Sequence, residues 1–342
     1  MQLKYKKSFL FNSLLLLILA LSSCDENKFD IDVSQSQVEV DWLRLDYDFT
    51  GLATKPSFNN YNDSLQKVYG SFYMLYASRI MNLGDVNSPN YEKSVMRFLM
   101  HKDIHQLFRT VDSTYHDLTP YQKEISNAFT YYHHYFPEKP IPVISSMVTG
   151  ISNNIVVTDS VLGVGLDLYL GDSNELYQLA AIPQYIRKKA NSDYLVSDMM
   201  RGWVLSEFEP ANRKDDLLSQ MINYGRSMYV MDALFPLGED HYKIGFTADE
   251  VKWCQDHEVM IWERLIEEKS LYSTDPRVIR SLTGPGPFTT GFPKESPAQV
   301  GFWVGWQIVR KYMDENPEMS LEELMKLEDA QTILRKSKYK PR

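Results

Sequence analysis

The chain has 342 residues and a formal net charge of −9, with 44% hydrophobic and 13% aromatic residues. This composition excludes a disordered chain and can supply the core of one large domain or two ordinary ones. A chain of net negative charge is a poor nucleic-acid binder, because phosphate contacts need clustered Lys and Arg, so we expect no nucleic-acid partner.

The first 24 residues have the pattern of a lipoprotein signal peptide. Three lysines within the first seven residues precede an apolar run over residues 9–21, and two serines then stand directly before Cys24. The run is too short to span a bilayer. We therefore predict that residues 1–23 are removed and that Cys24 is acylated, which gives a stable membrane anchor. The alternative is an ordinary signal peptide followed by a chance cysteine.

This processing has consequences for charge and location. Removing three lysines and no acid changes the net charge from −9 to −12, and such a surface repels anionic headgroups. The acyl anchor is therefore expected to hold the chain to the membrane. With Cys24 modified, Cys254 is alone, which excludes a disulfide-based fold. We expect a cell-envelope location, in the outer membrane more than the inner.

The N-terminal part of the chain predicts a tether, a strand and several helices. Residues 24–37 are polar and predict a tether, and residues 38–342 predict a single domain. Alternation over residues 38–47 predicts a strand with a bend near Trp42 and Leu43. Helical spacing then predicts helices at 62–82, at two places within 91–117, and at 119–136.

The middle of the chain and its C-terminal part differ in composition and in predicted secondary structure. Residues 141–170 are rich in Val, Ile, Thr and Gly, which favours strands at 142–149, 153–158 and 163–170. The rest is predominantly helical, with capping boxes expected at Thr247 and Ser320. The predicted helices are 173–190, 193–208, 214–235, 248–271, from Ser296-Pro297 through Tyr312, and 321–336. The predicted fold class is α+β, mostly α-helical with a small mixed or antiparallel sheet.

A stretch rich in proline and glycine, residues 273–295, separates two of these helices. It is longer than an ordinary connection, and such loops tend to be functional. We predict a flap over a groove, with Phe288 near its centre and Glu295 at its end.

Two histidine patterns are candidates for zinc. His101 and His105 are one helical turn apart, but lysine stands where a zinc-protease helix carries its water-activating glutamate. His257-Glu258 begins like the same motif, but isoleucine replaces the second histidine. We expect exposed histidines in the first case and boundary residues beside a packed face in the second.

Other catalytic signatures do not occur in the sequence. It contains no GxSxG elbow, no P-loop and no dinucleotide-binding glycine fingerprint. Cys254 lies mid-helix beside a tryptophan and is expected to be packed. We predict no catalytic residue, no metal ligand and no cofactor.

The helix after Ser296 has two glycines, Gly301 and Gly305, on one face. Glycine costs a helix about 1 kcal/mol relative to alanine, so we expect another backbone or a ring to approach closely there. The alternative is that this face, with Trp303 and Trp306 beside it, forms the floor of a groove.

Several short motifs together resemble the GldB-like family of gliding-motility-associated lipoproteins of Bacteroidetes. The match is densest in the C-terminal third, and the lipobox is consistent with it. The matching motifs are Val164-Gly-Leu-Asp-Leu-Tyr-Leu-Gly171, Tyr224-Gly225-Arg226, Ile244-Gly-Phe-Thr247, Trp253-Cys254-Gln255, Trp262-Glu263-Arg264, Leu271-Tyr-Ser-Thr-Asp275, Pro287-Phe288, Glu295-Ser296-Pro297 and Gly301-Phe-Trp-Val-Gly-Trp-Gln-Ile-Val-Arg310.

The resemblance implies an envelope lipoprotein associated with gliding and surface-protein secretion. It also implies a distant likeness to the zinc-metallopeptidase (zincin) fold, with a helix over residues 195–208 where the zinc motif would stand. No histidine occurs between His134 and His241, so the metal pair of that fold is missing. Zincin chemistry therefore does not carry over to this chain.

We accordingly expect a non-catalytic component that binds envelope proteins or peptides. The expected partner groove is formed by Asp167, Phe288, Glu295, Trp303 and Trp306. Two alternatives remain: a metal-dependent hydrolase with an unrecognised site, using His101 and His105, and a housekeeping scaffold lipoprotein.

Overall fold

The computed structural model describes residues 27–208 and 215–342, so the predicted signal segment and Cys24 lie outside the described residues. The chain divides into two units, Met1–Asp32 and Val33–Arg342. In the first unit a short turn forms where the Phe29 amide donates to Asn27 Oδ1 over 3.1 Å. Among the described residues no helix has the length and apolar character needed to cross a membrane.

The second unit begins five residues before the predicted domain boundary at Val38. The short helix η1 (Ser34–Ser36) packs against α7 (Thr119–Tyr135), and the Val38 amide donates to Thr130 Oγ1 over 3.0 Å. The last part of the predicted tether is therefore part of the folded unit.

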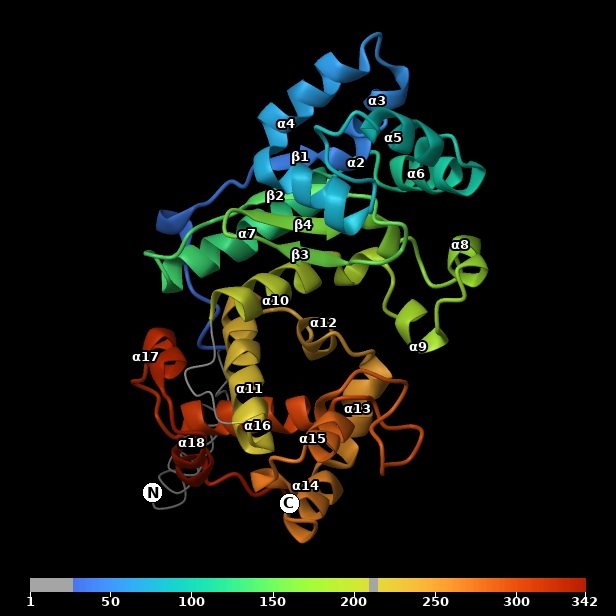
Figure 1. The fold of residues 1–342 in the computed structure, drawn as a ribbon. Helices are drawn as coiled ribbons and strands as arrows, with labels where there is room; N and C mark the ends of the chain where they lie inside the picture. Colours follow the sequence, from blue (N-terminus) through green and yellow to red (C-terminus); the bar gives the residue numbers. More distant parts are fainter. Residues whose placement is uncertain (1–26, 209–214) are drawn as a thin grey trace, which may run out of the picture. The chain divides into compact units, whose positions relative to one another are not determined.

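A four-stranded mixed sheet lies at the centre of the N-terminal half (Figure 1). The strand order is β1-β2-β4-β3, with parallel pairing between β1 and β2 and between β2 and β4, and antiparallel pairing between β4 and β3. The strands are β1 (Trp42–Arg44), β2 (Val143–Met147), β3 (Ile155–Val157) and β4 (Val161–Gly165). This confirms the α+β class and shows that the sheet is mixed.

Two predicted strands are wrong at their C-terminal ends. The first stops at Arg44, where α2 (Leu45–Asp48) begins, because Leu45 is fully buried and Arg44 turns back to form an ion pair with Asp46 over 2.7 Å. The fourth, predicted over 163–170, stops at Gly165 and continues as the 3₁₀ turn η3 (Leu166–Leu168).

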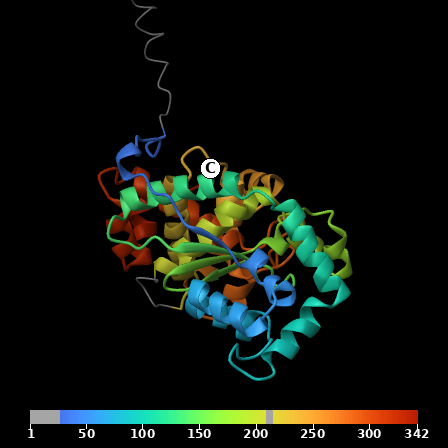
Figure 2. The ribbon, with the colours of Figure 1, turned by 90° about the horizontal axis from the view of Figure 1, so that it is seen from above.

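Helices cover both faces of the sheet, as Figure 2 shows for α4 (Phe58–Leu75) and α7. A Cβ on Gly163 would lie 2.6 Å from the Phe72 ring, so this face of β4 packs against α4. A Cβ on Gly202 of α10 (Leu195–Glu207) would lie 2.6 Å from Ile155, whose strand partner is Val164. Because adjacent residues on a strand point to opposite faces, α10 packs against the other face, beside β3.

The C-terminal half is built around the pair α11 (Leu217–Leu234) and α16 (Val300–Asp314). A Cβ on Gly305 would lie 2.0 Å from the Met221 carbonyl oxygen, and one on Gly225 would lie 2.3 Å from the Gly305 carbonyl oxygen. The two backbones therefore touch. The predicted close approach at Gly305 is confirmed, and the alternative of an open groove floor at this position is wrong.

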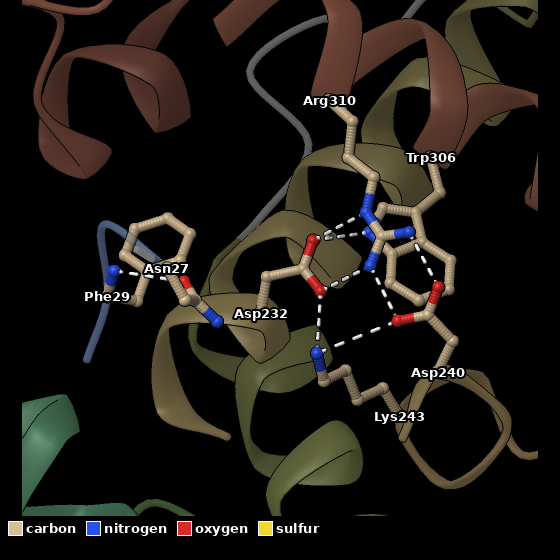
Figure 3. A network of polar contacts seen from close by, with 7 residues as sticks. All are labelled: Asn27, Phe29, Asp232, Asp240, Lys243, Trp306 and Arg310. Atoms are coloured by element: carbon tan, nitrogen blue, oxygen red, sulfur yellow. Dashed lines mark hydrogen bonds and ion pairs between the residues drawn. The ribbon is translucent and has the colours of Figure 1, made fainter. Parts of the chain in front are cut away.

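A buried network of charges joins α11, α16 and α12 (Asp240–Ile244) (Figure 3). Asp232 accepts from Lys243 Nζ at 3.0 Å, Trp306 Nε1 at 3.0 Å and Arg310 Nη2 at 2.6 Å. Arg310 also donates to both oxygens of Asp240 at 2.7 Å, and its guanidinium lies 3.7 Å above the Trp306 ring centroid. Burial alone would raise the pKa of Asp240, but the Arg310 hydrogen bond and charge lower it overall.

The remaining elements are mostly short helices. Both predicted capping boxes, at Thr247 and Ser320, are confirmed. These elements are α3 (Gly51–Thr54), η2 (Tyr76–Ile80), α5 (Tyr91–Leu99), α6 (Lys102–Thr114), α8 (Glu175–Leu179), α9 (Gln184–Arg187), η4 (Ser192–Tyr194), α13 (Ala248–Asp256), α14 (Glu258–Glu267), η5 (Ser270–Tyr272), α15 (Pro276–Thr283), α17 (Leu321–Lys326) and α18 (Ala330–Ser337).

Three long predicted helices are each broken, and one predicted loop is partly helical. The helix predicted over 173–190 is two short helices, α8 and α9. The helix predicted over 248–271 breaks at His257, between α13 and α14. The helix predicted over 321–336 breaks after Lys326 and resumes as α18. The loop predicted over 273–295 contains α15, which Asp275 caps with Pro276 in its first turn.

Candidate binding cleft

A cleft of about 640 Å³ lies at the carboxyl ends of β2 and β4. The segments that follow these two strands supply part of its wall, and ligands commonly bind in crevices at this edge of parallel strands. Helices α9 and α10 and the start of the C-terminal half supply the rest. The residues that line the cleft include Ile151, Asn154, Tyr169, Ile182, Tyr185, Ile186, Lys189, Tyr194, Asp198, Arg201, Leu205, Tyr224, Gly245, Pro285 and Gln299.

The polar base of the cleft is a hydrogen-bonded group on α10. Asp198 Oδ2 accepts from the Tyr169 hydroxyl at 2.9 Å, and Asp198 Oδ1 accepts from Arg201 Nη2. Arg201 Nη1 donates to the carbonyl oxygens of Tyr242 and Lys243 at 3.2 and 3.1 Å. The side chains of Arg201 and Asp198 are 16% and 11% exposed, so this group is largely desolvated but reaches the cleft.

Burial and charge fix the protonation of this group. Burial works to lower the pKa of Arg201, but the Asp198 carboxylate outweighs it and the pKa is raised. Burial raises the pKa of Tyr169 well above its ordinary value, and the hydrogen bond to Asp198 adds to this. At neutral pH the base of the cleft therefore holds an arginine cation and a neutral phenol, and both are hydrogen-bonded to Asp198.

Gly245 lets the backbone approach Arg201. It ends α12 with φ +74° and ψ 34°, and a Cβ at this position would lie 2.6 Å from Arg201 Nη2. A side chain here would meet both a left-handed backbone and the guanidinium.

Asp167 shapes the cleft wall from inside the protein. Its carboxylate is fully buried and accepts from the amides of Thr149 and Ile151 at 3.0 and 2.6 Å. Ile151 has φ +60°, which is unusual for a β-branched residue. Backbone strain of this kind persists where the surroundings hold it and is concentrated at functional sites. Burial raises the pKa of Asp167 to about 6, against the opposing effect of these amides.

The edge strand β3 runs from the cleft. Asn154, which lines the cleft, accepts at its carbonyl from the Gly165 amide over 2.8 Å, and the Thr158 amide donates to the Val161 carbonyl over 2.9 Å. Alternate residues of an antiparallel strand bond to the same neighbour. The backbone groups of Ile155 and Val157 therefore point away from β4, toward the open edge of the sheet.

The outer wall of the cleft is apolar. Ile182 and Ile186 come from the segment around α9, and Leu205 comes from the same face of α10 as Asp198 and Arg201. Ile186 and Leu205 are exposed at 38% and 40%. The cleft therefore combines a polar, hydrogen-bonded base with an apolar outer wall.

The predicted partner groove is wrong for three of its five residues. Asp167, Trp303 and Trp306 are buried, because Asp167 holds the turn at Thr149–Ile151 and both tryptophans face the helix core. Phe288 is half-buried and Glu295 is exposed, and neither lines the cleft. The stretch that was predicted as a flap reaches the cleft through Pro285.

The other sequence candidates lie elsewhere. His101 is the N-cap residue of α6 and is exposed, and His105 lines a separate cavity of about 260 Å³ with Asp46 and Asp112. Within the described residues no group of three or more His, Cys, Asp or Glu side chains is arranged to hold a metal. Cys254 is buried and its pKa is raised by burial, as its predicted packing implies.

Sequence reasoning missed the residues at the base of the cleft. Tyr169, Asp198 and Arg201 come from two segments that only the fold brings together. One signal was present, because Asp198, Arg201 and Leu205 recur at helical spacing on a helix whose other faces are apolar.

A profile of the family described as gliding motility protein GldB matches residues 26–341. No curated protein and no solved structure matches the chain, so the likeness to a zinc-metallopeptidase fold stays a prediction. The matched span includes every strand and helix described above. The chain belongs to the family of the gliding motility protein GldB.

Proposed function

We propose that this envelope lipoprotein is a non-catalytic component that holds an extended segment of a partner protein in the cleft. The observation that carries the proposal is the position of β3, an edge strand with outward-facing backbone groups beside a large cleft. An extended peptide adds to such an edge through main-chain hydrogen bonds, while neighbouring pockets select its side chains.

The chemistry of the cleft supports binding more than catalysis. Asp198 is held by Arg201 and Tyr169, so it is not a free general base, and the raised pKa of Tyr169 keeps its proton in place. Lys189 and Arg201 line the cleft, and each has a carboxylate partner: Arg201 pairs with Asp198, and Lys189 with Glu250 at 4.0 Å. A partner segment with apolar and polar side chains fits this lining.

A lipid anchor at Cys24 would keep the protein in the cell envelope. Lipidation of Cys24 and an outer-membrane location are part of the proposal, and they would hold the cleft close to other envelope proteins. The partner is then a protein or peptide of the same compartment.

Photo-crosslinking in the source bacterium tests the proposal. A photoreactive amino acid at Leu205, on the cleft wall, should capture a partner protein. The same group at Val68, an exposed residue of α4 on the opposite side of the sheet, is the matched control and should not capture it. Val157→Pro removes an outward amide without touching the β3–β4 ladder, so it should abolish the Leu205 crosslink while leaving the melting temperature nearly unchanged.

Three results would contradict the proposal. Equal capture at Leu205 and Val68 would place the interaction outside the cleft. A Leu205 crosslink that survives Val157→Pro would show that the partner does not add to the edge of β3. A partner recovered in cleaved form, with metal bound to the purified chain and lost on His101→Ala or His105→Ala, would favour the hydrolase alternative instead.

A further inference from the structure

The C-terminal segment carries a dense group of cations in an acidic chain. Arg335, Lys336, Lys338, Lys340 and Arg342 are all exposed and lie within eight residues. Lys311 of α16 lies beside them, since Lys311 and Lys338 approach the same carboxylate, that of Glu315, at 3.5 and 2.5 Å. We call these six residues the basic face.

Tyr339, which stands between Lys338 and Lys340, attaches the C-terminal segment to α14. The Tyr339 hydroxyl donates to Glu258 Oε1 over 2.6 Å, and its ring packs edge-on against Trp262 with the centroids 5.1 Å apart. The segment is therefore fixed against α14, and Lys338 and Lys340 flank this attachment.

A hollow of about 400 Å³ lies at the basic face. Lys311, Lys338, Lys340 and Arg342 line it, together with the carboxylates of Glu258 and Asp314. Arg310 also lines it, but its charge is paired with Asp232 and Asp240. Counting Glu315 with the two lining carboxylates, the six side-chain cations of the basic face exceed the local acids by three.

An apolar stripe runs along α14 next to Tyr339. Val259 and Ile266 are 36% and 49% exposed, and Trp262 lies between them at helical spacing. Glu263 borders the stripe, because it is four residues after Val259 and three before Ile266, and Glu267 lies further round the helix. Cations beside exposed aliphatic and indole side chains are the combination that interfacial membrane-binding surfaces use.

We infer that the basic face and the apolar stripe together form a docking surface for a bilayer that contains anionic phospholipids. The phosphate-bearing headgroups meet the cations and the hollow, and Val259, Trp262 and Ile266 enter the headgroup region. The repulsion expected from the net charge of the whole chain is thereby reversed locally. The surface does not involve the cleft and does not depend on the function proposed for it.

Vesicle sedimentation of unlipidated residues 25–342 tests the inference, since the unit Val33–Arg342 is compact by itself. We expect binding to vesicles of phosphatidylcholine with phosphatidylglycerol, weak binding to phosphatidylcholine alone, and loss of binding at high salt. Each cation contributes about a fivefold increase in partitioning, so the triple variant Lys336→Gln, Lys340→Gln, Arg342→Gln should lower it by roughly a hundredfold.

The matched control makes the same charge change on exposed lysines of α4, α5 and α6. Lys67→Gln, Lys93→Gln and Lys102→Gln together should leave vesicle binding nearly unchanged. The pair Val259→Ser and Ile266→Ser should weaken binding to an extent that persists at high salt.

Three outcomes would overturn the inference. One is equal binding to neutral and anionic vesicles, and another is an equal loss in the control triple variant. The third is displacement from vesicles by inorganic phosphate at constant ionic strength, which would make a soluble phosphate compound, and not a bilayer, the ligand of the hollow.

Discussion

The Asp167 side chain links the core to the cleft wall. Its carboxylate has no cationic partner among its hydrogen bonds, and it is held by the amides of Thr149 and Ile151 and by the Thr149 hydroxyl. The carboxylate is needed to hold Ile151 in its left-handed conformation, and burial makes the charge costly.

This balance predicts a specific pH dependence for Asp167→Asn. The pKa of Asp167 is about 6 in the folded chain, above its unfolded value, so the folded state binds the proton more tightly. The contribution of this group to stability therefore falls as pH rises from about 4 to about 6. The free energy of unfolding of the wild type minus that of the variant should fall by about 3 kcal/mol over this window.

Urea unfolding of both proteins across the window measures the difference. The shape of the profile is the readout, because the variant also changes the hydrogen bonds to the turn. Parallel profiles would show that Asp167 ionises with an ordinary pKa.

Gly245 gives a second prediction at the scale of one residue. Gly245→Ala places a methyl group in a left-handed conformation, which costs roughly 1–2 kcal/mol, and brings it against Arg201. Gly150→Ala is the control, because Gly150 has φ +69° and open space around its Cβ position. The melting temperature should fall further for Gly245→Ala, and equal shifts would show that Arg201 moves aside without cost.

At the scale of elements, the contact between α11 and α16 brings two helix backbones together. Gly305→Ala puts a methyl group 2.0 Å from the Met221 carbonyl oxygen. Overpacking should lower the free energy of unfolding by roughly 1–3 kcal/mol, although alanine favours the helix itself. Gly301→Ala is the comparison, because its nearest contact is at 3.0 Å; denaturant unfolding that gave equal losses would contradict the backbone contact.

Local signals predicted many elements well. The capping boxes at Thr247 and Ser320 are present, because caps act within one turn of the chain. The helix predicted over 119–136 is present as Thr119–Tyr135, with proline in its first turn but no side-chain cap. Helix breaks were predicted poorly, since His257 carries no proline or glycine signal. The helix α15 was missed although Asp275 and Pro276 form a cap and first turn, because the surrounding prolines and glycines favoured a loop.

The cleft is a property of the whole unit and could not be predicted in the same way. Trp303 and Trp306 were expected at a groove because glycines beside aromatic residues suit either a groove or a tight helix contact. The structure shows the contact, with α11 filling the space. Which neighbour fills a glycine face is decided by residues far away in the sequence, and one chain does not reveal that pairing.

For the whole molecule, the prediction concerns Cys24. Metabolic labelling with an alkynyl fatty acid should mark the wild type and leave Cys24→Ala unlabelled, because the acyl chains attach to this thiol and to the N-terminus that cleavage exposes. Labelling of both proteins would show that the segment before Cys24 is not a lipoprotein signal.

The network around Asp232 has a consequence for how the two central helices are oriented. Where Gly225 meets Gly305 the two backbones touch and only glycine fits, so this contact sets both the separation of α11 and α16 and the face that each helix turns toward the other. Rotating α16 by one residue, about 100°, would carry Arg310 and Trp306 away from Asp232 and leave a buried carboxylate without its main donors. The glycine contact and the ion network therefore favour the same orientation: the backbones can touch only where the glycines meet, and in that orientation Asp232 faces Trp306 and Arg310.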